Sequence, residues 1–147
     1  MGTISEYEQD LFAWAERNAG LIRQGRYEEL DYLHLAEELE EFMGNTRREL
    51  YRRLRILLAH LLKWRYQPEG RSSSWAGTIR TQRSDLARLL KQNPSLQRFV
   101  AEEMDEAYGD ARELAATETG KPLEVFPDHC PFPADQVLDK GFWPEVD

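Results

Sequence analysis

Two arginines of this sequence fall on the apolar faces of expected helices, which makes them the first residues to consider for chemistry. At about 100° per residue, Arg83 and Arg65 each lie within the apolar stripe of their own helix. A buried charge is unfavourable unless it is paired and hydrogen-bonded. Glu37 and Glu40 lie nearest the border of a neighbouring apolar face, so we predict an Arg–Glu network inside the bundle.

Such a network has two interpretations. It could be a polar cluster that fixes the register of the helices and does no chemistry. Alternatively, Arg65, Arg80 and Arg83 could hold a carboxylate or a phosphate through bidentate hydrogen bonds, with Trp64 and Trp75 as planar surfaces beside the ligand.

Histidines offer two further candidates. His60 lies at the edge of an apolar stripe near Trp64 and Arg53, where it could act as a general acid or base near neutral pH or serve only structure. A second histidine shares one helical face with three carboxylates at the spacing by which a helix presents metal ligands: His34, Glu37, Glu38 and Glu41.

The metal interpretation of that face is weak. Di-iron bundles place a Glu-x-x-His pair on each of two helices, pointing inward, whereas this set occurs once and points away from most of the leucines. We therefore expect no metal, with His34, Glu38 and Glu41 as the weak candidates. No glycine-rich phosphate loop, nucleophile elbow or paired Cys-x-x-Cys is present, and the sequence implies no cofactor.

The elements that position these residues are helices. Five stretches have a helical period or helical end signals, and no stretch alternates as a strand does, so we predict an all-α fold: an antiparallel bundle of about five helices over about 5–119. Prolines forbid a long helix from about 120 to 147, yet this tail is too apolar to be free, so it should pack on the bundle. We expect one domain, 1–147.

Capping residues indicate where the helices begin and end. Ser5 with Glu8 and Thr46 with Glu49 form capping-box patterns, which start the first and third helices. Gly44 ends a second helix that begins near residue 27, and its apolar side is built from Tyr32, Leu33, Ala36, Leu39 and Met43. A serine of the 72–74 run caps a fourth helix, and a fifth runs from about 94 to 119, before Gly120.

Composition limits the classes of function. The 147 residues carry a net charge of −8, distributed as −8 over residues 1–46, +9 over 47–91 and −9 over 92–147. The overall charge argues against nucleic acid, although the basic middle could present a face to an acidic ligand or pair with its neighbours. A lone Cys130, the absence of a long apolar run and a polar N-terminus favour the cytoplasm and no membrane.

Several segments together resemble a known family. They are Tyr7-x-x-Asp10 with Trp14, Glu37-Glu38-Leu39-Glu40, His60-Leu61-Leu62-Lys63-Trp64, Trp75 with Ile79 and Arg83, and Asn93-Pro94-Ser95-Leu96. The sequence resembles, over nearly its whole length, the bacterial family catalogued as domain of unknown function twenty-nine. The resemblance implies an all-helical fold and no activity. It also adds weight to Glu37, Glu38, His60 and Lys63 as catalytic candidates.

Three functions follow as hypotheses. The first is a helical protein-interaction or regulatory module that acts on a protein partner or on its own copy, which an exposed apolar patch would favour. The second is a small enzyme or anion-binding protein with a pocket between the second, third and fourth helices. Nucleic-acid contact through the basic middle is the third and weakest.

Overall fold

The computed structural model describes residues 5–145, and over that range it is all-α, with no strand. The fold class predicted from the sequence is confirmed. Six α-helices and four short 3-10 turns follow one another in this order: α1 (Glu6–Gln9), α2 (Leu11–Arg23), η1 (Tyr27–Glu29), α3 (Tyr32–Tyr66), η2 (Pro68–Gly70), α4 (Ser73–Gln92), η3 (Pro94–Phe99), α5 (Val100–Thr119), η4 (Leu123–Val125) and α6 (Ala134–Leu138).

The predicted start of the first helix is confirmed, but the helix is interrupted. Ser5 Oγ accepts a hydrogen bond from the Glu8 amide at 3.3 Å, as an N-cap does. Asp10 then leaves the helical conformation, and its carboxylate accepts from the Ala13 amide at 3.0 Å. One expected helix is therefore a single turn, α1, followed by α2.

The largest departure from the sequence prediction is in α3. The predicted stop at Gly44 and the predicted start at Thr46 are both wrong, because one helix of 35 residues runs through them. A glycine inside a helix costs only about 1 kcal/mol relative to alanine. The Glu, Leu and Arg residues on either side are strong helix formers and outweigh that cost.

The later element boundaries agree with the sequence, except that the fifth helix, expected from about residue 94, is α-helical only from Val100. Ser72 Oγ accepts from the Trp75 amide at 3.2 Å at the start of α4. Pro94 opens η3, which leads into α5, and Gly120 ends α5 in the left-handed conformation with φ of 71°.

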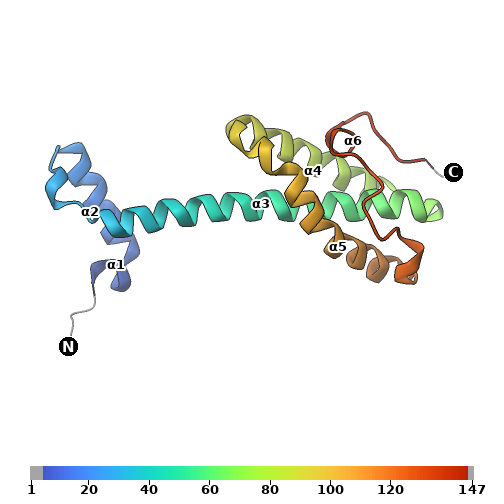
Figure 1. The fold of residues 1–147 in the computed structure, drawn as a ribbon, viewed down its shortest axis with the longest axis horizontal. Helices are drawn as coiled ribbons and strands as arrows, with labels where there is room; N and C mark the ends of the chain where they lie inside the picture. Colours follow the sequence, from blue (N-terminus) through green and yellow to red (C-terminus); the bar gives the residue numbers. More distant parts are fainter. Residues whose placement is uncertain (1–4, 146–147) are drawn as a thin grey trace. The chain divides into compact units, whose positions relative to one another are not determined.

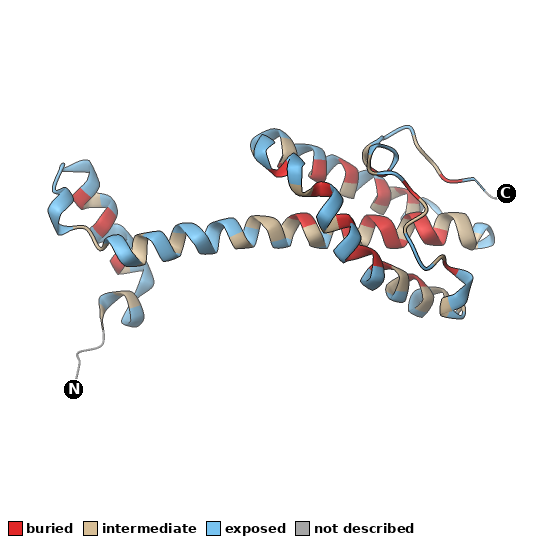
Figure 2. Cartoon of the chain, in the orientation of Figure 1, coloured by how far each residue is buried: buried red, intermediate tan, exposed pale blue. Residues whose placement is uncertain are grey.

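The chain divides into two compact units, Met1–Asn45 and Thr46–Asp147, here called the N-terminal and C-terminal units. In the C-terminal unit, α4 and α5 pack with the later part of α3 (Figure 1). Figure 2 shows that buried residues are concentrated in these three helices. The core contains the leucine stripe that the sequence predicted, packed against apolar residues of the other helices: Leu50, Leu54, Leu57, Leu58, Leu61, Ile79, Leu86, Met104 and Ala107.

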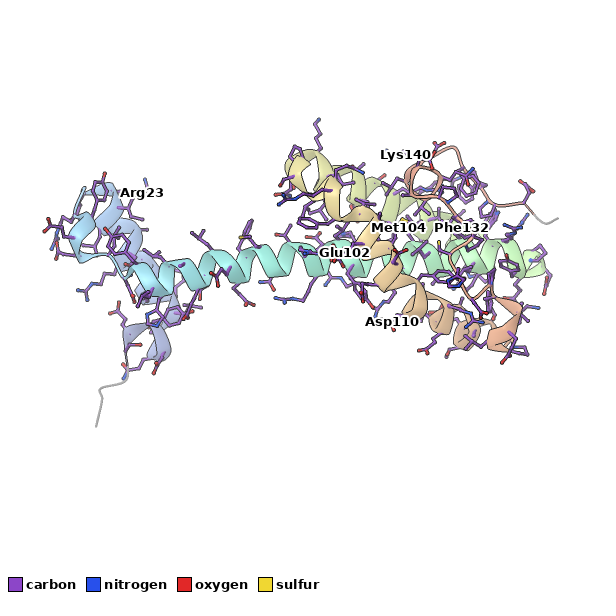
Figure 3. The ribbon with its side chains drawn as sticks, viewed as in Figure 1. Arg23, Glu102, Met104, Asp110, Phe132 and Lys140 are labelled. Atoms are coloured by element: carbon purple, nitrogen blue, oxygen red, sulfur yellow. The ribbon has the colours of Figure 1, made fainter. Side chains whose placement is uncertain are left out.

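The segment after Gly120 packs on the C-terminal unit, as predicted. Phe126, Phe132 and Val137 are buried in the same core as Met104, and Phe132 and Met104 are labelled in Figure 3. The side chain of Tyr108 holds this segment by donating to the Pro127 carbonyl at 2.5 Å.

The N-terminal unit has a much smaller interior. Among its described residues, the buried ones are Trp14, Asn18 and Leu21, which lie on one face of α2. Asn18 is satisfied there, since it donates to the Trp14 carbonyl at 2.9 Å and accepts from the Asp31 amide at 3.0 Å. Polar contacts therefore contribute a large share of what holds this unit together.

Candidate functional site

Arg83 is the most buried charged side chain of the predicted cluster, with 2% of its surface exposed. Its Nε donates to the Val137 carbonyl at 2.8 Å and one terminal nitrogen donates to the Gln136 carbonyl at 3.3 Å. The predicted glutamate partner for Arg83 is wrong: the guanidinium binds the last turn of α6, where carbonyls face outward from a helix end. Desolvation lowers the pKa of Arg83, which Asp139 partly opposes.

Two predicted partners of Arg83 lie in the other unit. Glu37 and Glu40 belong to the N-terminal unit and their side chains are exposed. A helical wheel identifies which side of a helix a charge faces, but not which distant segment supplies its acceptors. Arg83 thus anchors the C-terminal segment to α4, and the two nitrogens that hold it there cannot also clamp a ligand.

Lys63 is also buried, at 3% exposure, and is paired. Its ammonium donates to Glu118 of α5 and lies 5.0 Å from the ring centroid of Trp75. Glu118 was not singled out from the sequence, because it follows the exposed side of its helix and nothing local marks it as a partner.

His60 lies one turn before Lys63 and is held by its own helix. Its Nδ1 donates to the Ile56 carbonyl at 2.9 Å, and burial lowers its pKa. The ring is therefore neutral at neutral pH. Between them, His60, Lys63 and Glu118 have the residue types of an acid–base site, but each is engaged in a contact within the fold.

The remaining predicted ligand-binding residues are distributed around the aromatic residues of the C-terminal unit. The guanidiniums of Arg80 and Arg65 lie 5.3 Å from the ring centroids of Trp143 and Tyr66 respectively, and Trp64 packs 4.8 Å from Trp143. Trp75, as above, covers Lys63. Three of the predicted residues, Trp64, Arg80 and Arg83, thus meet at the Trp143 ring, which joins the C-terminal segment to α3 and α4, whereas Arg65 and Trp75 are engaged elsewhere.

Several basic residues of the middle of the sequence form ion pairs within the C-terminal unit. Arg47 contacts Glu103 at 2.5 Å and Glu102 at 3.5 Å, and Arg53 contacts Asp85 at 2.9 Å. Figure 3 labels Glu102 and Asp110 on α5; Asp110 accepts a hydrogen bond from Tyr51. The charge of +9 is matched by the −9 of residues 92–147, so the charge of −8 on the chain is that of residues 1–46.

In the N-terminal unit, Asp31 is the centre of a polar network. Its carboxylate accepts from Trp14 Nε1 at 2.9 Å and from His34 Nδ1 at 2.6 Å, and it also caps α3 through the His34 amide at 3.4 Å. The Asp31 carboxylate raises the pKa of His34, and the bonds from His34 and Trp14 lower the pKa of Asp31. The sequence did not single out Asp31, although its position before a helix is typical of an N-cap.

Tyr7 of α1 completes this network from the other side. Its ring stacks on His34 with centroids 4.0 Å apart, and its hydroxyl donates to Glu38 at 2.6 Å, which raises the pKa of Tyr7 to about 12. Two of the weak metal candidates, His34 and Glu38, are therefore used in holding α1 against α3. Among residues 5–145, no group of three or more His, Cys, Asp or Glu side chains could hold a metal ion.

The apolar side of the early part of α3 has no cover. His34 and Glu38 place α1 on one face, whereas Tyr32, Ala36, Leu39 and Met43 fall on the opposite face at spacings of four, three and four residues. We call these four residues the α3 seam. All four are exposed, Leu39 by 65% and Met43 by 62%.

A second apolar stripe lies uncovered on α2. Leu11, Ala15, Ala19 and Ile22, with Phe12 beside them, are exposed on a face of α2 next to the one that carries Trp14 and Leu21. Of the ten large apolar side chains left exposed among the described residues, nine belong to the N-terminal unit. Soluble monomers seldom leave such residues gathered together.

A surface hollow in the C-terminal unit contains the Asp128-His129-Cys130 run. It is lined also by Asp105 and Tyr108. Burial raises the pKa of the Cys130 thiol, whose sulfur lies 3.4 Å from the Phe132 carbonyl. The thiol is therefore protonated at neutral pH and is a poor nucleophile.

Comparison with protein families gives one match. The model described as domain of unknown function DUF29 covers residues 6–143. The chain is a member of the DUF29 family. The resemblance seen in the sequence is thereby confirmed, and neither a curated protein nor a solved structure matches the chain.

The DUF29 match includes both units. It begins at the first residue of α1 and ends at Trp143, the ring that lies near Arg80 and Arg83. The uncovered α3 seam and the anchored C-terminal segment are both within the DUF29 region. None of the described helices of this DUF29 protein has the length and hydropathy needed to span a membrane.

Proposed function

We propose that this protein is a helical interaction module whose N-terminal unit docks a protein partner. The uncovered α3 seam carries the proposal, since Leu39 and Met43 remain exposed in a unit that buries only Trp14, Asn18 and Leu21 among its described residues. Units of about 40 residues usually need oligomerisation, a metal or disulfides for stability. A protein partner would supply the missing apolar cover.

The other functions have less support. Arg83, the centre of the proposed anion site, uses Nε and Nη2 on the carbonyls of Val137 and Gln136, and its remaining nitrogen, Nη1, is buried away from the surface. Arg47 and Arg53, in the basic middle, pair with Glu103 and Asp85. We therefore rank an anion-binding enzyme and a nucleic-acid protein below docking, and place the module in the cytoplasm on the composition of its sequence.

Site-specific photocrosslinking in cells tests the proposal. A photoreactive amino acid at Leu39 should give one dominant protein adduct, whereas the same amino acid at Val125, an exposed apolar position of the C-terminal unit, should not. The partner, once purified, should bind the unlabelled protein, and Leu39→Asn should weaken binding without lowering the melting temperature. Equal adducts at both positions, or none, would contradict the proposal.

A further inference from the structure

We infer that the partner presents a basic amphipathic helix to the α3 seam. This inference rests on the docking function proposed above and adds the chemistry of the partner. It follows from two separate properties of the N-terminal unit, the spacing of its apolar residues and the sign of its charge.

The spacing indicates a helix as the occupant. Tyr32, Ala36, Leu39 and Met43 repeat at intervals of four, three and four residues, which is the pattern of the core positions of a coiled coil. Side chains at this spacing form the holes into which the knobs of one facing helix fit. An extended peptide would instead need an open strand edge, and residues 5–45 contain no strand.

The charge indicates a basic occupant. Residues 1–46 hold 11 acidic and 3 basic side chains, giving them a charge of −8. Glu40, which follows Leu39 directly, is exposed beside the seam at a position that flanks a partner helix, and Glu37 is exposed farther round the same side of α3. A lysine or arginine on the flank of the occupant would pair with the Glu40 carboxylate, and the attraction of the acidic unit as a whole would also speed the encounter.

The same charge disfavours a second copy of this chain on the seam. Two N-terminal units meeting face to face would bring together two surfaces that each carry −8. Like charges across an interface are unfavourable and are one means of rejecting wrong partners. The negative charge of the unit therefore favours binding of a basic helix and disfavours binding of a second N-terminal unit.

Peptide binding to the full chain tests the inference. The probes are three synthetic peptides of about 14 residues, the length of about four helical turns: an amphipathic Leu/Lys helix, the same peptide with Glu for Lys, and a Leu/Lys peptide of scrambled order. Isothermal titration calorimetry measures the dissociation constant of each. We expect the amphipathic Leu/Lys peptide alone to bind, about tenfold more weakly at high salt.

Two variants separate shape from charge. Leu39→Asn should reduce affinity by about tenfold, the effect of losing about 1.4 kcal/mol of apolar contact. A double Glu37→Gln and Glu40→Gln variant should weaken binding by about two- to tenfold and flatten the salt dependence. Val125→Asn, in the C-terminal unit, serves as the matched control and should change nothing.

The outcomes distinguish this inference from the docking function. If the Leu/Glu or the scrambled peptide binds as well as the amphipathic Leu/Lys peptide, the inference is overturned, while docking is still judged by the crosslinking at Leu39. A stable dimer that Leu39→Asn dissociates would place a second copy on the seam, which overturns the inference and keeps docking. No peptide binding together with no specific crosslink would overturn both.

Discussion

Arg83 is a buried cation that two backbone carbonyls hold through Nε and Nη2, while Nη1 is buried without a hydrogen-bond partner among the described residues. Each bond from a charged donor contributes about 1.5–3 kcal/mol, and a substitution would remove the donor of the Val137 carbonyl, whereas the Gln136 carbonyl keeps the bond that it accepts from the Asp139 amide at 3.2 Å. Arg83→Ala should therefore destabilise the C-terminal unit by about 3 kcal/mol in urea denaturation. Arg88→Ala, at an exposed ion pair with Asp85, should cost under about 1 kcal/mol. Equal, small effects would show that Arg83 is not an anchor.

His34 should make the stability of the N-terminal unit depend on pH. Its pKa in the folded protein is raised above 6.5 by Asp31, so folding is favoured by the protonated ring. This contribution is fully present below pH 6.5 and is lost as the pH rises through the folded pKa. Hydrogen exchange of the α2 amides should thus show lower protection at alkaline pH, after correction for the intrinsic rate. In His34→Gln this loss of protection at alkaline pH should disappear. A loss that persists in the variant would show that another titratable group causes the pH dependence.

At the residue scale, the sequence predicted burial better than it predicted partners. The wheel placed Arg83 and Arg65 on apolar faces; Arg83 is buried and Arg65 is half-buried. The acceptors of Arg83, two carbonyls of α6, belong to a segment brought near by the fold. Periodicity along one helix contains no information on which segment that will be.

At the scale of the element, α3 is a continuous helix through Gly44, where end signals predicted a stop. A proline substitution distinguishes one continuous helix from two helices that meet at Gly44, because proline is common just after a helix but costs about 3 kcal/mol inside one. Gly44→Pro should therefore lower the helical circular dichroism signal and the melting temperature, whereas Gly44→Ala should preserve both. If Gly44→Pro were neutral, α3 would be two helices.

The α3 example also shows why end signals mislead. Gly44 followed by Thr46 and Glu49 has the residue types of a stop and a capping box, but these motifs supply only about 1 kcal/mol each. The apolar period of Tyr32, Ala36, Leu39 and Met43 was recognised correctly. The exposure of these residues could not be predicted. Periodicity predicts that a helix has an apolar face, but it does not indicate whether another part of the same chain covers that face.

At the scale of the whole molecule, the two units should differ in local stability. The C-terminal unit has a continuous apolar core, while the described part of the N-terminal unit buries three residues. Regions with few buried contacts open at low free energy. Hydrogen exchange followed by mass spectrometry should show faster exchange for peptides within 11–23 than within 54–62. A partner bound to the α3 seam should slow the exchange of peptides within 11–23. Equal exchange rates for the two ranges in the free protein would refute the predicted difference in stability between the units.

The anchoring of α6 by Arg83 has a consequence for synthesis on the ribosome. The contacts of the N-terminal unit, Tyr7 to Glu38 and Trp14 to Asp31, span 31 and 17 residues, so they can form early. Arg83 must wait for Val137, 54 residues later, which at about 5–20 residues per second takes roughly 3–11 s. The nascent chain would therefore display its docking seam before the C-terminal unit can close, and a partner could engage it while translation continues.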